Sequence, residues 1–271
     1  MGTSMSSKGP NGKNPLVPPW AEEGDSVVIS GGGDDGADLE VNNADVPTVP
    51  KGMPSSTRFK SARQAFGEYA KSGSRSDLKK SLGHYSRNST GKGGGAAKRL
   101  ASGITAGTGL FGLLGGNSVN TVSGNLALSD LSGLSTDQAI DKIVTHLTPN
   151  SADADLVRTS MNYALSEALQ ESEHIDDFVF TPDLMGEVFS FYITDLVFQQ
   201  VLLDMGSAWF KVETAIRQIT MENELRELIS VVVDGALEKI SGGDLSNITQ
   251  SQISQVQISA INQTITEWEA Y

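Results

Sequence analysis

The second residue, a glycine, is the group in this sequence with the clearest chemical potential. A small residue at position 2 normally permits removal of the initiator methionine, so Gly2 would present a primary amine. The first six residues, Met1-Gly2-Thr3-Ser4-Met5-Ser6, also fit the M-G-x-x-x-[ST] pattern of N-myristoylation. That pattern has meaning only in a cell that contains the acyltransferase. Gly2 is therefore a candidate for covalent modification.

A proline-rich segment with one tryptophan follows, Asn14-Pro15-Leu16-Val17-Pro18-Pro19-Trp20. Its prolines favour an extended, polyproline-like backbone, and the indole supplies one large anchor. The pattern is typical of a linear motif that docks in the groove of another protein, with a proline-rich spacer as the alternative. The residues predicted to contact a partner are Pro15, Leu16, Pro18, Pro19 and Trp20.

Residues that commonly perform catalysis or bind metals form no complete pattern. Glu171-x-x-His174 resembles half of a ferritin-like carboxylate site, but such a site needs a second E-x-x-H. The other histidines, His84 and His146, have no glutamate three residues before them, and the chain has no cysteine. A Ser-His-Asp triad cannot be argued from these scattered histidines. We therefore predict no catalytic residue and no metal site, and interpret 171–177 as an acidic link between helices.

A glycine-rich stretch contains Gly107-Thr108-Gly109-Leu110-Phe111-Gly112, which matches the G-x-G-x-x-G pattern of dinucleotide-binding proteins. No β-rich run precedes this match, as the dinucleotide fold would require. A phosphate loop is also absent at Gly91-Lys92-Gly93, because no Ser or Thr follows the lysine. We predict close packing of small residues against another helix, and no cofactor.

Charge is unevenly distributed along the chain. Residues 1–56 contain eight Asp or Glu and three Lys or Arg. Residues 57–99 contain two Asp or Glu and eleven Lys or Arg, and residues 100–271 contain twenty-three Asp or Glu and six Lys or Arg. The basic segment therefore has three interpretations: a solvated face, a surface for an acidic protein, or a surface for nucleic acid. Nucleic acid is the least favoured of the three. No apolar signal segment follows the start, so we expect a cytoplasmic location.

The stretch from Thr181 to Lys211 is the element around which the rest must pack. Thr181 can cap a helix, and Pro182 suits its first position. Apolar residues then occupy all sides, which indicates burial by neighbours or insertion in a membrane. Asp195 and Asp204 oppose the membrane alternative, since each would cost about 2.5–3.5 kcal/mol in mid-span. We predict the central helix of a soluble helical body.

Helical periodicity recurs on both sides of that element. In the basic segment, Ala62, Ala65, Phe66, Tyr69 and Ala70 share one helical face. Further boundaries are predicted at the capping box Ser135-Thr136-Asp137-Gln138, at Thr148-Pro149-Asn150, near Ala152, near Gly206, at Gly242-Gly243, and for a last helix at Gln250 to Glu269.

The predicted fold class is therefore all-α, a helical bundle body with a long disordered N-terminal tail. Residues 1–56 would form the tail with its Pro/Trp motif, residues 57–129 a basic and glycine-rich segment of helices and loops, and residues 130–271 the acidic helical body.

Two sets of short motifs carry a family resemblance. One is Met1-Gly2-Thr3-Ser4 with Gly9-Pro10 and Asn14 to Trp20; the other is Arg63 to Ala70, Leu82-Gly83-His84-Tyr85 and the glycine-rich run to Leu114. Together they resemble the QatB proteins of bacterial Qat anti-phage defence operons. After Leu114 the helical body offers only a compatible pattern.

The resemblance implies a non-enzymatic component that works with an ATPase, a QueC-like enzyme (QatC) and a TatD-like nuclease. QueC-type enzymes act with ATP on a carboxylated 7-deazapurine, so the family suggests that QatC holds the tail and conjugates a deazapurine to Gly2. Small side chains at Thr3 and Ser4 would let the backbone enter a narrow pocket, while Pro15 to Trp20 would bind outside it.

Two other functional classes remain open at this point. The basic segment would suit an adaptor that recruits a nuclease to nucleic acid, and N-myristoylation would make the chain a membrane adaptor. The mass of the N-terminus distinguishes a deazapurine, a myristoyl group and an unmodified glycine.

Overall fold

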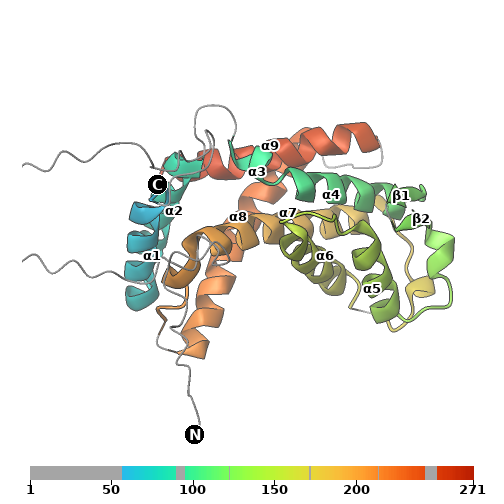
Figure 1. Cartoon of the computed structure of the whole chain (residues 1–271), viewed down its shortest axis with the longest axis horizontal. Helices are drawn as coiled ribbons and strands as arrows, with labels where there is room; N and C mark the ends of the chain where they lie inside the picture. The colour runs from blue at the N-terminus through green and yellow to red at the C-terminus, as the bar shows by residue number, and fades with distance from the viewer. Residues whose placement is uncertain (1–56, 90–94, 122, 171, 213, 242–248) are drawn as a thin grey trace, which may run out of the picture. The chain divides into compact units, whose positions relative to one another are not determined.

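The computed structural model describes residues 57–89, 95–121, 123–170, 172–212, 214–241 and 249–271, which belong to one compact unit that spans Pro54–Tyr271. Within these residues the predicted all-α class is confirmed, because helices predominate and the only sheet described has two short strands (Figure 1). The tail prediction and its residues Gly2 to Trp20 lie outside the described residues.

The central helix, α7 (Pro182–Met205), begins and ends as the sequence predicts. The Thr181 hydroxyl accepts a hydrogen bond from the amide of Leu184 at 3.3 Å, and Pro182 occupies the first turn. The helix ends at Gly206, whose φ of 51° is a conformation that glycine tolerates. α7 contacts α1, α4, α6, α8 and α9, so nearly every side of it is covered.

Burial accounts for the apolar composition of α7. Pro182–Ala208 is the one described segment that is long and apolar enough to cross a membrane by length and composition, and 72% of its apolar window is buried inside the unit. The core helix of a globular protein passes the same test.

The basic segment folds into three helices, α1 (Lys60–Ser72), α2 (Arg75–Ser89) and the short α3 (Gly95–Arg99). α1 and α2 form a hairpin that turns at Gly73 (φ 70°). The predicted apolar stripe of α1 is buried, and α2 packs on α9 (Gln250–Glu269) near the C-terminus (Figure 1). The basic helices therefore share one core with the acidic part of the chain.

Close packing explains the glycines of α4 (Ala101–Leu114). A Cβ atom on Gly103 would lie 2.7 Å from both methyl carbons of Leu196, and one on Gly107 would lie 2.6 Å from the Tyr192 ring. The Tyr192 hydroxyl donates to the carbonyl of Gly103 at 2.8 Å. The G-x-G-x-x-G match therefore serves helix packing, as predicted.

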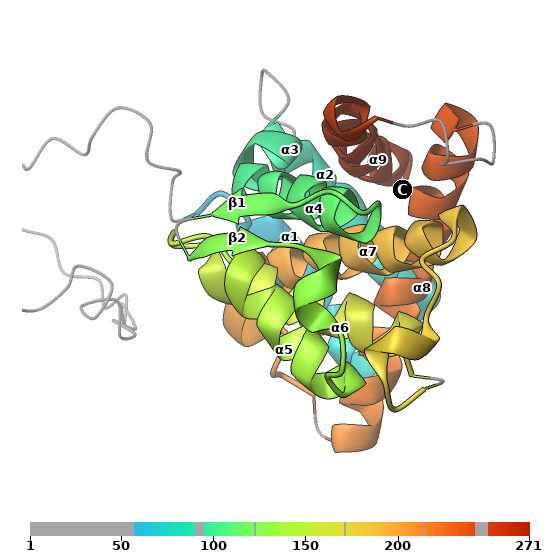
Figure 2. The ribbon, with the colours of Figure 1, turned by 90° about the vertical axis from the view of Figure 1, so that its right-hand side faces the viewer.

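The acidic part continues with α5 (Thr136–Leu147), α6 (Ala154–Ala168) and the long α8 (Ala215–Ser241). The predicted capping box of α5 is confirmed, because the Ser135 hydroxyl accepts from the amide of Gln138 at 3.3 Å. α6 lies along α7, and α5 packs on α6 (Figure 2).

A small β-hairpin forms the only sheet among the described residues. β1 (Val119–Thr121) pairs antiparallel with β2 (Gly124–Leu126) next to α5 (Figure 2). The sequence analysis expects no strand here, because three residues are too few to show an alternating pattern.

Candidate interaction surfaces

Residues of the types that bind metal ions do not gather into a site within the described residues. No group of three or more His, Cys, Asp or Glu in this part of the chain could hold a metal ion. His174 is exposed and its backbone bridges to Ser135, while Glu171 lies outside the described residues. The polar groups that do cluster in this unit lie at the contacts between helices.

The first cluster surrounds Asp204, near the C-terminal end of α7. Arg99 of α3 donates to its Oδ1 atom at 2.6 Å, and the Tyr85 hydroxyl of α2 donates to Oδ2 at 2.9 Å. The Arg63 guanidinium of α1 donates to the main-chain carbonyl of the same aspartate at 2.7 Å. Three basic-segment helices thus meet one residue of the central helix.

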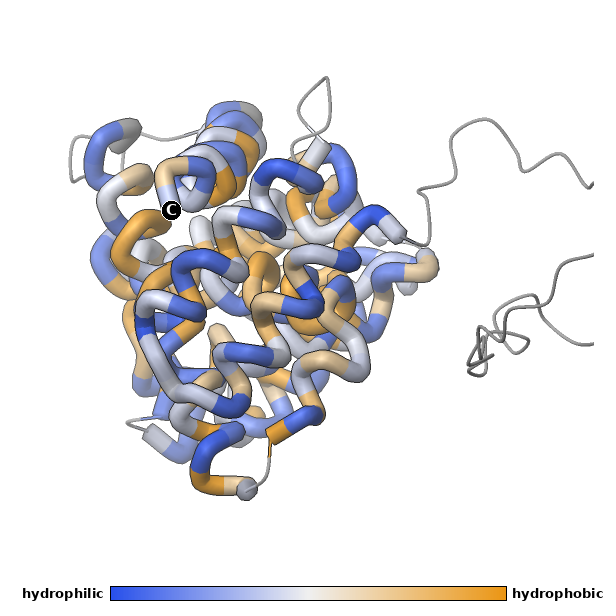
Figure 3. Tube along the Cα trace, turned by 90° about the vertical axis from the view of Figure 1, so that its left-hand side faces the viewer, coloured by the Kyte–Doolittle hydropathy of each residue, from blue (hydrophilic) through white to orange (hydrophobic). Residues whose placement is uncertain are grey.

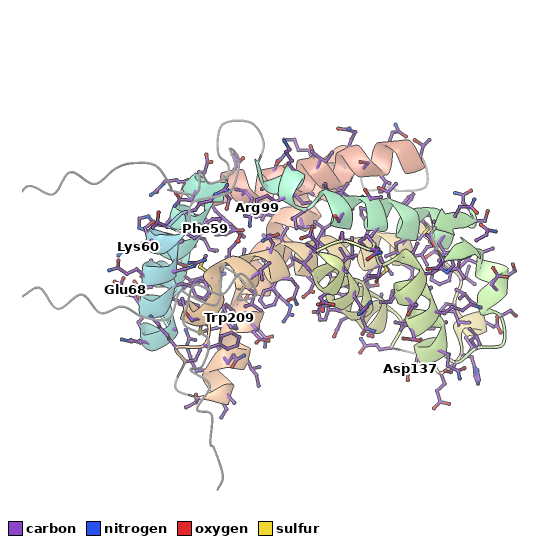
Figure 4. The ribbon with its side chains drawn as sticks, viewed as in Figure 1. Phe59, Lys60, Glu68, Arg99, Asp137 and Trp209 are labelled. Atoms are coloured by element: carbon purple, nitrogen blue, oxygen red, sulfur yellow. The ribbon has the colours of Figure 1, made fainter. Side chains whose placement is uncertain are left out.

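Aromatic rings enclose the Arg99 contact. The guanidinium carbon of Arg99 lies 5.4 Å from the centroid of the Phe59 ring, which stacks on Tyr85 with centroids 5.1 Å apart. Figure 4 shows Arg99 and Phe59 together at the junction of the N-terminal helices with the rest of the unit. Burial raises the pKa of Tyr85, and the Asp204 charge raises it further, so the phenol remains a donor.

The second cluster surrounds Asp195, whose side chain is completely buried. Arg226 of α8 donates to its Oδ1 from Nε at 3.1 Å and from Nη2 at 2.9 Å, and Gln199 donates to Oδ2 at 3.2 Å. The guanidinium carbon lies 3.9 Å from the Phe198 centroid and 4.8 Å from that of Tyr163. This cluster joins α6, α7 and α8.

The third cluster joins α1 to α8. The Tyr69 hydroxyl donates to the carboxylate of Glu224, and Arg217 lies over the Tyr69 ring at 4.8 Å. Arg217 also donates to the Tyr69 carbonyl at 3.3 Å. Burial, with the hydrogen bond to Glu224, raises the pKa of Tyr69. All three clusters use ionised groups to join helices, and at Asp195 and Asp204 the carboxylate is buried and needs a partner.

A separate feature is the basic outer face of the α1–α2 hairpin. Its exposed cations are Lys60, Arg63, Lys71, Arg75, Lys79, Lys80 and Arg87. Figure 3, which faces this end of the unit, shows hydrophilic positions along the outer helices and apolar ones behind them. Figure 4 places Lys60 on this hairpin and the acidic Asp137 on α5 at the opposite end.

The aromatic residues of this hairpin and its entry face inward. Phe59, Phe66, Tyr69 and Tyr85 are each at most 6% exposed. Single-stranded nucleic acid is usually held by bases that stack on exposed aromatic rings. The basic face therefore provides charge without stacking platforms, which favours an acidic protein surface over a nucleic-acid strand.

Comparison with known protein families finds a family model that matches most of the folded unit. The model of "Qat anti-phage system associated protein QatB" matches residues 91–267, from the segment just before α3 into the last turn of α9. The chain belongs to the QatB family. It is accordingly a component of the Qat anti-phage system. No curated protein and no solved structure matches the chain.

The QatB match and the motif-based resemblance cover different parts of the sequence. The motifs lie mainly before residue 91, whereas the match covers the helices for which the sequence showed only a compatible pattern. The roles of Arg99 and Arg226 were not predicted from the sequence, in which Asp195 and Asp204 stood out only as interruptions of an apolar run. Their presence in that run was the available signal, because a buried aspartate requires a cation or donors.

Proposed function

We propose that this QatB-family chain is a non-enzymatic component of the defence complex whose N-terminal tail is held by a QueC-like partner, QatC. Gly2 would occupy the partner's active site, with Thr3 and Ser4 in a narrow entrance. Pro15, Leu16, Pro18, Pro19 and Trp20 would bind outside that entrance. The ATPase and the TatD-like nuclease of the same system are further partners, and the complex would act in the cytoplasm.

The proposal that this chain is a non-enzymatic component is supported by the way the described unit uses its buried ionisable groups. Asp195 and Asp204 are each bound to an arginine from another helix, at 2.9 Å and 2.6 Å. A carboxylate held by an arginine of another helix stabilises the packing of the two helices. The described unit is therefore suited to act as a scaffold, and the proposed chemistry belongs to the tail.

Conjugation of a deazapurine to Gly2 is the chemical step that we propose for the tail. An α-amino group has a pKa near 7.7–8.0, so an appreciable fraction is unprotonated and nucleophilic at neutral pH. A glycine adds no side chain that would obstruct the approach of its amine to a carboxyl group activated by ATP. The amine would attack the carboxyl carbon, an amide bond would form, and the phosphate-containing group supplied by ATP would leave as the amine loses a proton. The prolines of the anchor reduce the entropy lost on binding, because their backbone is already restricted.

Deletion of residues 2–20 tests the proposal directly, in cells that contain the whole operon. We expect loss of QatC from a pull-down and loss of phage protection, with unchanged circular dichroism of the helical unit. Deletion of residues 30–48, which has the same length and spares both motifs, is the matched control and should retain binding. Full-strength QatC binding by the first variant would contradict the proposed contact.

Intact mass of the native protein tests the modification separately. We expect Gly2 to carry a deazapurine when QatC is present and to be unmodified when QatC is omitted. Gly2→Pro should block conjugation, since its secondary ring amine replaces a primary one, while Trp20→Ala should weaken the complex. An unmodified glycine in the complete system would rule out conjugation, and a myristoyl mass would indicate a membrane adaptor.

The exposed cations of the α1–α2 hairpin favour one alternative, an adaptor that recruits the nuclease to nucleic acid. If the chain bound phosphates, the logarithm of its binding constant would fall linearly with the logarithm of the salt concentration. We expect weak binding of duplex and single-stranded DNA by the purified chain, because its net charge is −13 and the hairpin aromatics are buried. Tight, strongly salt-dependent binding that Lys79→Glu abolishes would favour this alternative.

A further inference from the structure

A groove lies between the N-terminal part of α6 and the C-terminal end of α7. It has a volume of about 450 Å³ and is lined mostly by apolar surface. The apolar side chains are Leu156 from α6, Leu202 and Leu203 from α7, and Phe210, which follows the bend at Gly206. α6 and α7 lie side by side along this edge (Figure 2).

Two large apolar side chains of the groove are exposed to solvent. Leu203 is 67% exposed and Phe210 is 68% exposed. The exposure of Phe210 accompanies the burial of its neighbour Trp209, whose ring stacks on Phe66 with centroids 5.1 Å apart. Exposed apolar side chains beside a groove are a common feature of protein-binding sites.

The groove also has an acidic edge. Asp153 and Asp155 contribute to its lining, and no Lys or Arg is among the described residues that line it. The Asp155 side chain is 97% exposed, with Arg158 at 3.7 Å on the same helix. Asp153 accepts a hydrogen bond from the Ser102 hydroxyl at 3.4 Å. Such an edge complements a cation that lies next to an apolar group.

We propose that this groove docks a partner-protein segment that presents a large apolar side chain close to a Lys or Arg. The apolar side chain enters between Leu156 and Leu202, Leu203 and Phe210 cover its flanks, and the cation pairs with Asp155. The ligand is a protein segment because Leu203 and Phe210 are two-thirds exposed, so covering them requires a chain that continues across the edge.

The charge of the groove disfavours two other occupants. An anionic membrane surface would be repelled by Asp153, by Asp155 and by the net charge of −13. A second copy bound face to face would bring the same two aspartates together across a two-fold axis. A basic, apolar segment avoids both costs and covers the exposed side chains of Leu203 and Phe210.

The proposal is tested by fluorescence anisotropy with the full chain and a short labelled peptide that contains Leu, Trp and Lys. We expect Leu203→Ser and Phe210→Ser each to weaken binding about tenfold or more. Val231→Ser is the matched control, because Val231 of α8 is equally exposed at 67% and lies outside the groove. It should change the affinity less than about twofold.

A charge exchange tests the acidic edge. Asp155→Lys should weaken binding of the Lys peptide and permit binding of a peptide in which Glu replaces each Lys. The wild-type chain should not bind that Glu peptide. Thermal unfolding of each variant separates a lost contact from a lost fold.

Four results would overturn the proposal. The first is no binding of the Lys peptide to the wild-type chain, and the second is equal binding by the Leu203, Phe210 and Val231 variants. The third is self-association of the wild type in sedimentation that Phe210→Ser abolishes, which would make a second copy the occupant. The fourth is binding of the wild type, and not of Phe210→Ser, to vesicles of anionic lipid.

Discussion

The two buried aspartates of α7 lie nine residues apart in sequence, yet they are held in different ways. Asp195 is fully buried, and its arginine comes from α8, within the acidic part of the chain. Asp204 is 9% exposed at its side chain, and its donors come from α1, α2 and α3 of the basic segment. The Asp195 cluster therefore joins helices within the acidic part of the chain, while the Asp204 cluster attaches the basic helices to that part.

This difference shows how the segregated charge of the sequence is used. Most cations of the basic segment are exposed, and Arg63 and Arg99 donate hydrogen bonds to a single residue of α7. The attachment of α1–α3 therefore depends on a small number of polar contacts in addition to apolar packing. Loss of one contact at Asp204 should affect those helices first, whereas loss at Asp195 should affect α6, α7 and α8 first.

The largest expected effect follows removal of the cation at Asp195. Arg226→Ala should lower the free energy of unfolding by about 3–5 kcal/mol, because it leaves a buried charge without its partner. Urea unfolding measures this change, and a typical domain has only about 5–15 kcal/mol in total. Arg158→Ala, which removes an exposed pair with Asp155, is the control and should cost about 0–1 kcal/mol.

Simultaneous replacement of both partners sharpens that result. Arg226→Met with Asp195→Leu should recover most of the lost stability, since an apolar pair of similar volume needs no desolvation of charge. Equal losses in the single and double variants would show that the packing of Arg226 on Phe198, and not the ion pair, stabilises this region.

A smaller, localised effect is expected at Asp204. Arg99→Ala should cost about 2–3 kcal/mol, because Tyr85 still donates to the carboxylate and some water reaches it. Hydrogen exchange should accelerate mainly in α1, α2 and α3, while Arg226→Ala should accelerate exchange throughout α6, α7 and α8. Uniform acceleration in both variants would contradict the division of roles between the clusters.

Removal of one hydroxyl at the same cluster should have a still smaller effect. Tyr85→Phe keeps the ring contacts with Phe59 and Trp268 and removes the hydroxyl that donates to Asp204. We expect a loss of roughly 1.5 kcal/mol in urea unfolding at neutral pH. A loss as large as that of Arg99→Ala would indicate that the phenol, and not the guanidinium, is the main partner of the carboxylate.

Alkaline pH should produce the smallest effect, again at Asp204. Burial raises the pKa of Tyr85 above its ordinary value of 10.0, so the folded state keeps the proton that the unfolded chain loses. Its contribution to stability is therefore complete below about pH 10 and declines as pH rises further, by under about 1 kcal/mol at pH 10.5. Tyr85→Phe should show a shallower alkaline decline in urea unfolding than the wild type, and identical slopes would contradict this assignment.

The helical class and the positions of several helix ends can be predicted from the amino-acid sequence alone. The caps at Thr181 and Ser135 bond to amides three residues away, and α9 occupies the predicted range Gln250–Glu269. These signals could be predicted because a cap joins residues that are adjacent in the chain, whatever the rest of the fold does.

The groups that meet across the unit depend on how the helices pack. Arg226 lies 31 residues from Asp195, and Arg99 lies 105 residues from Asp204. No local spacing encodes such a pairing, because it depends on how whole helices pack. The exposure of Phe210 beside the buried Trp209 has the same origin. Both rings are apolar in sequence, and the turn after Gly206 together with the surface of Phe66 selects which one enters the core.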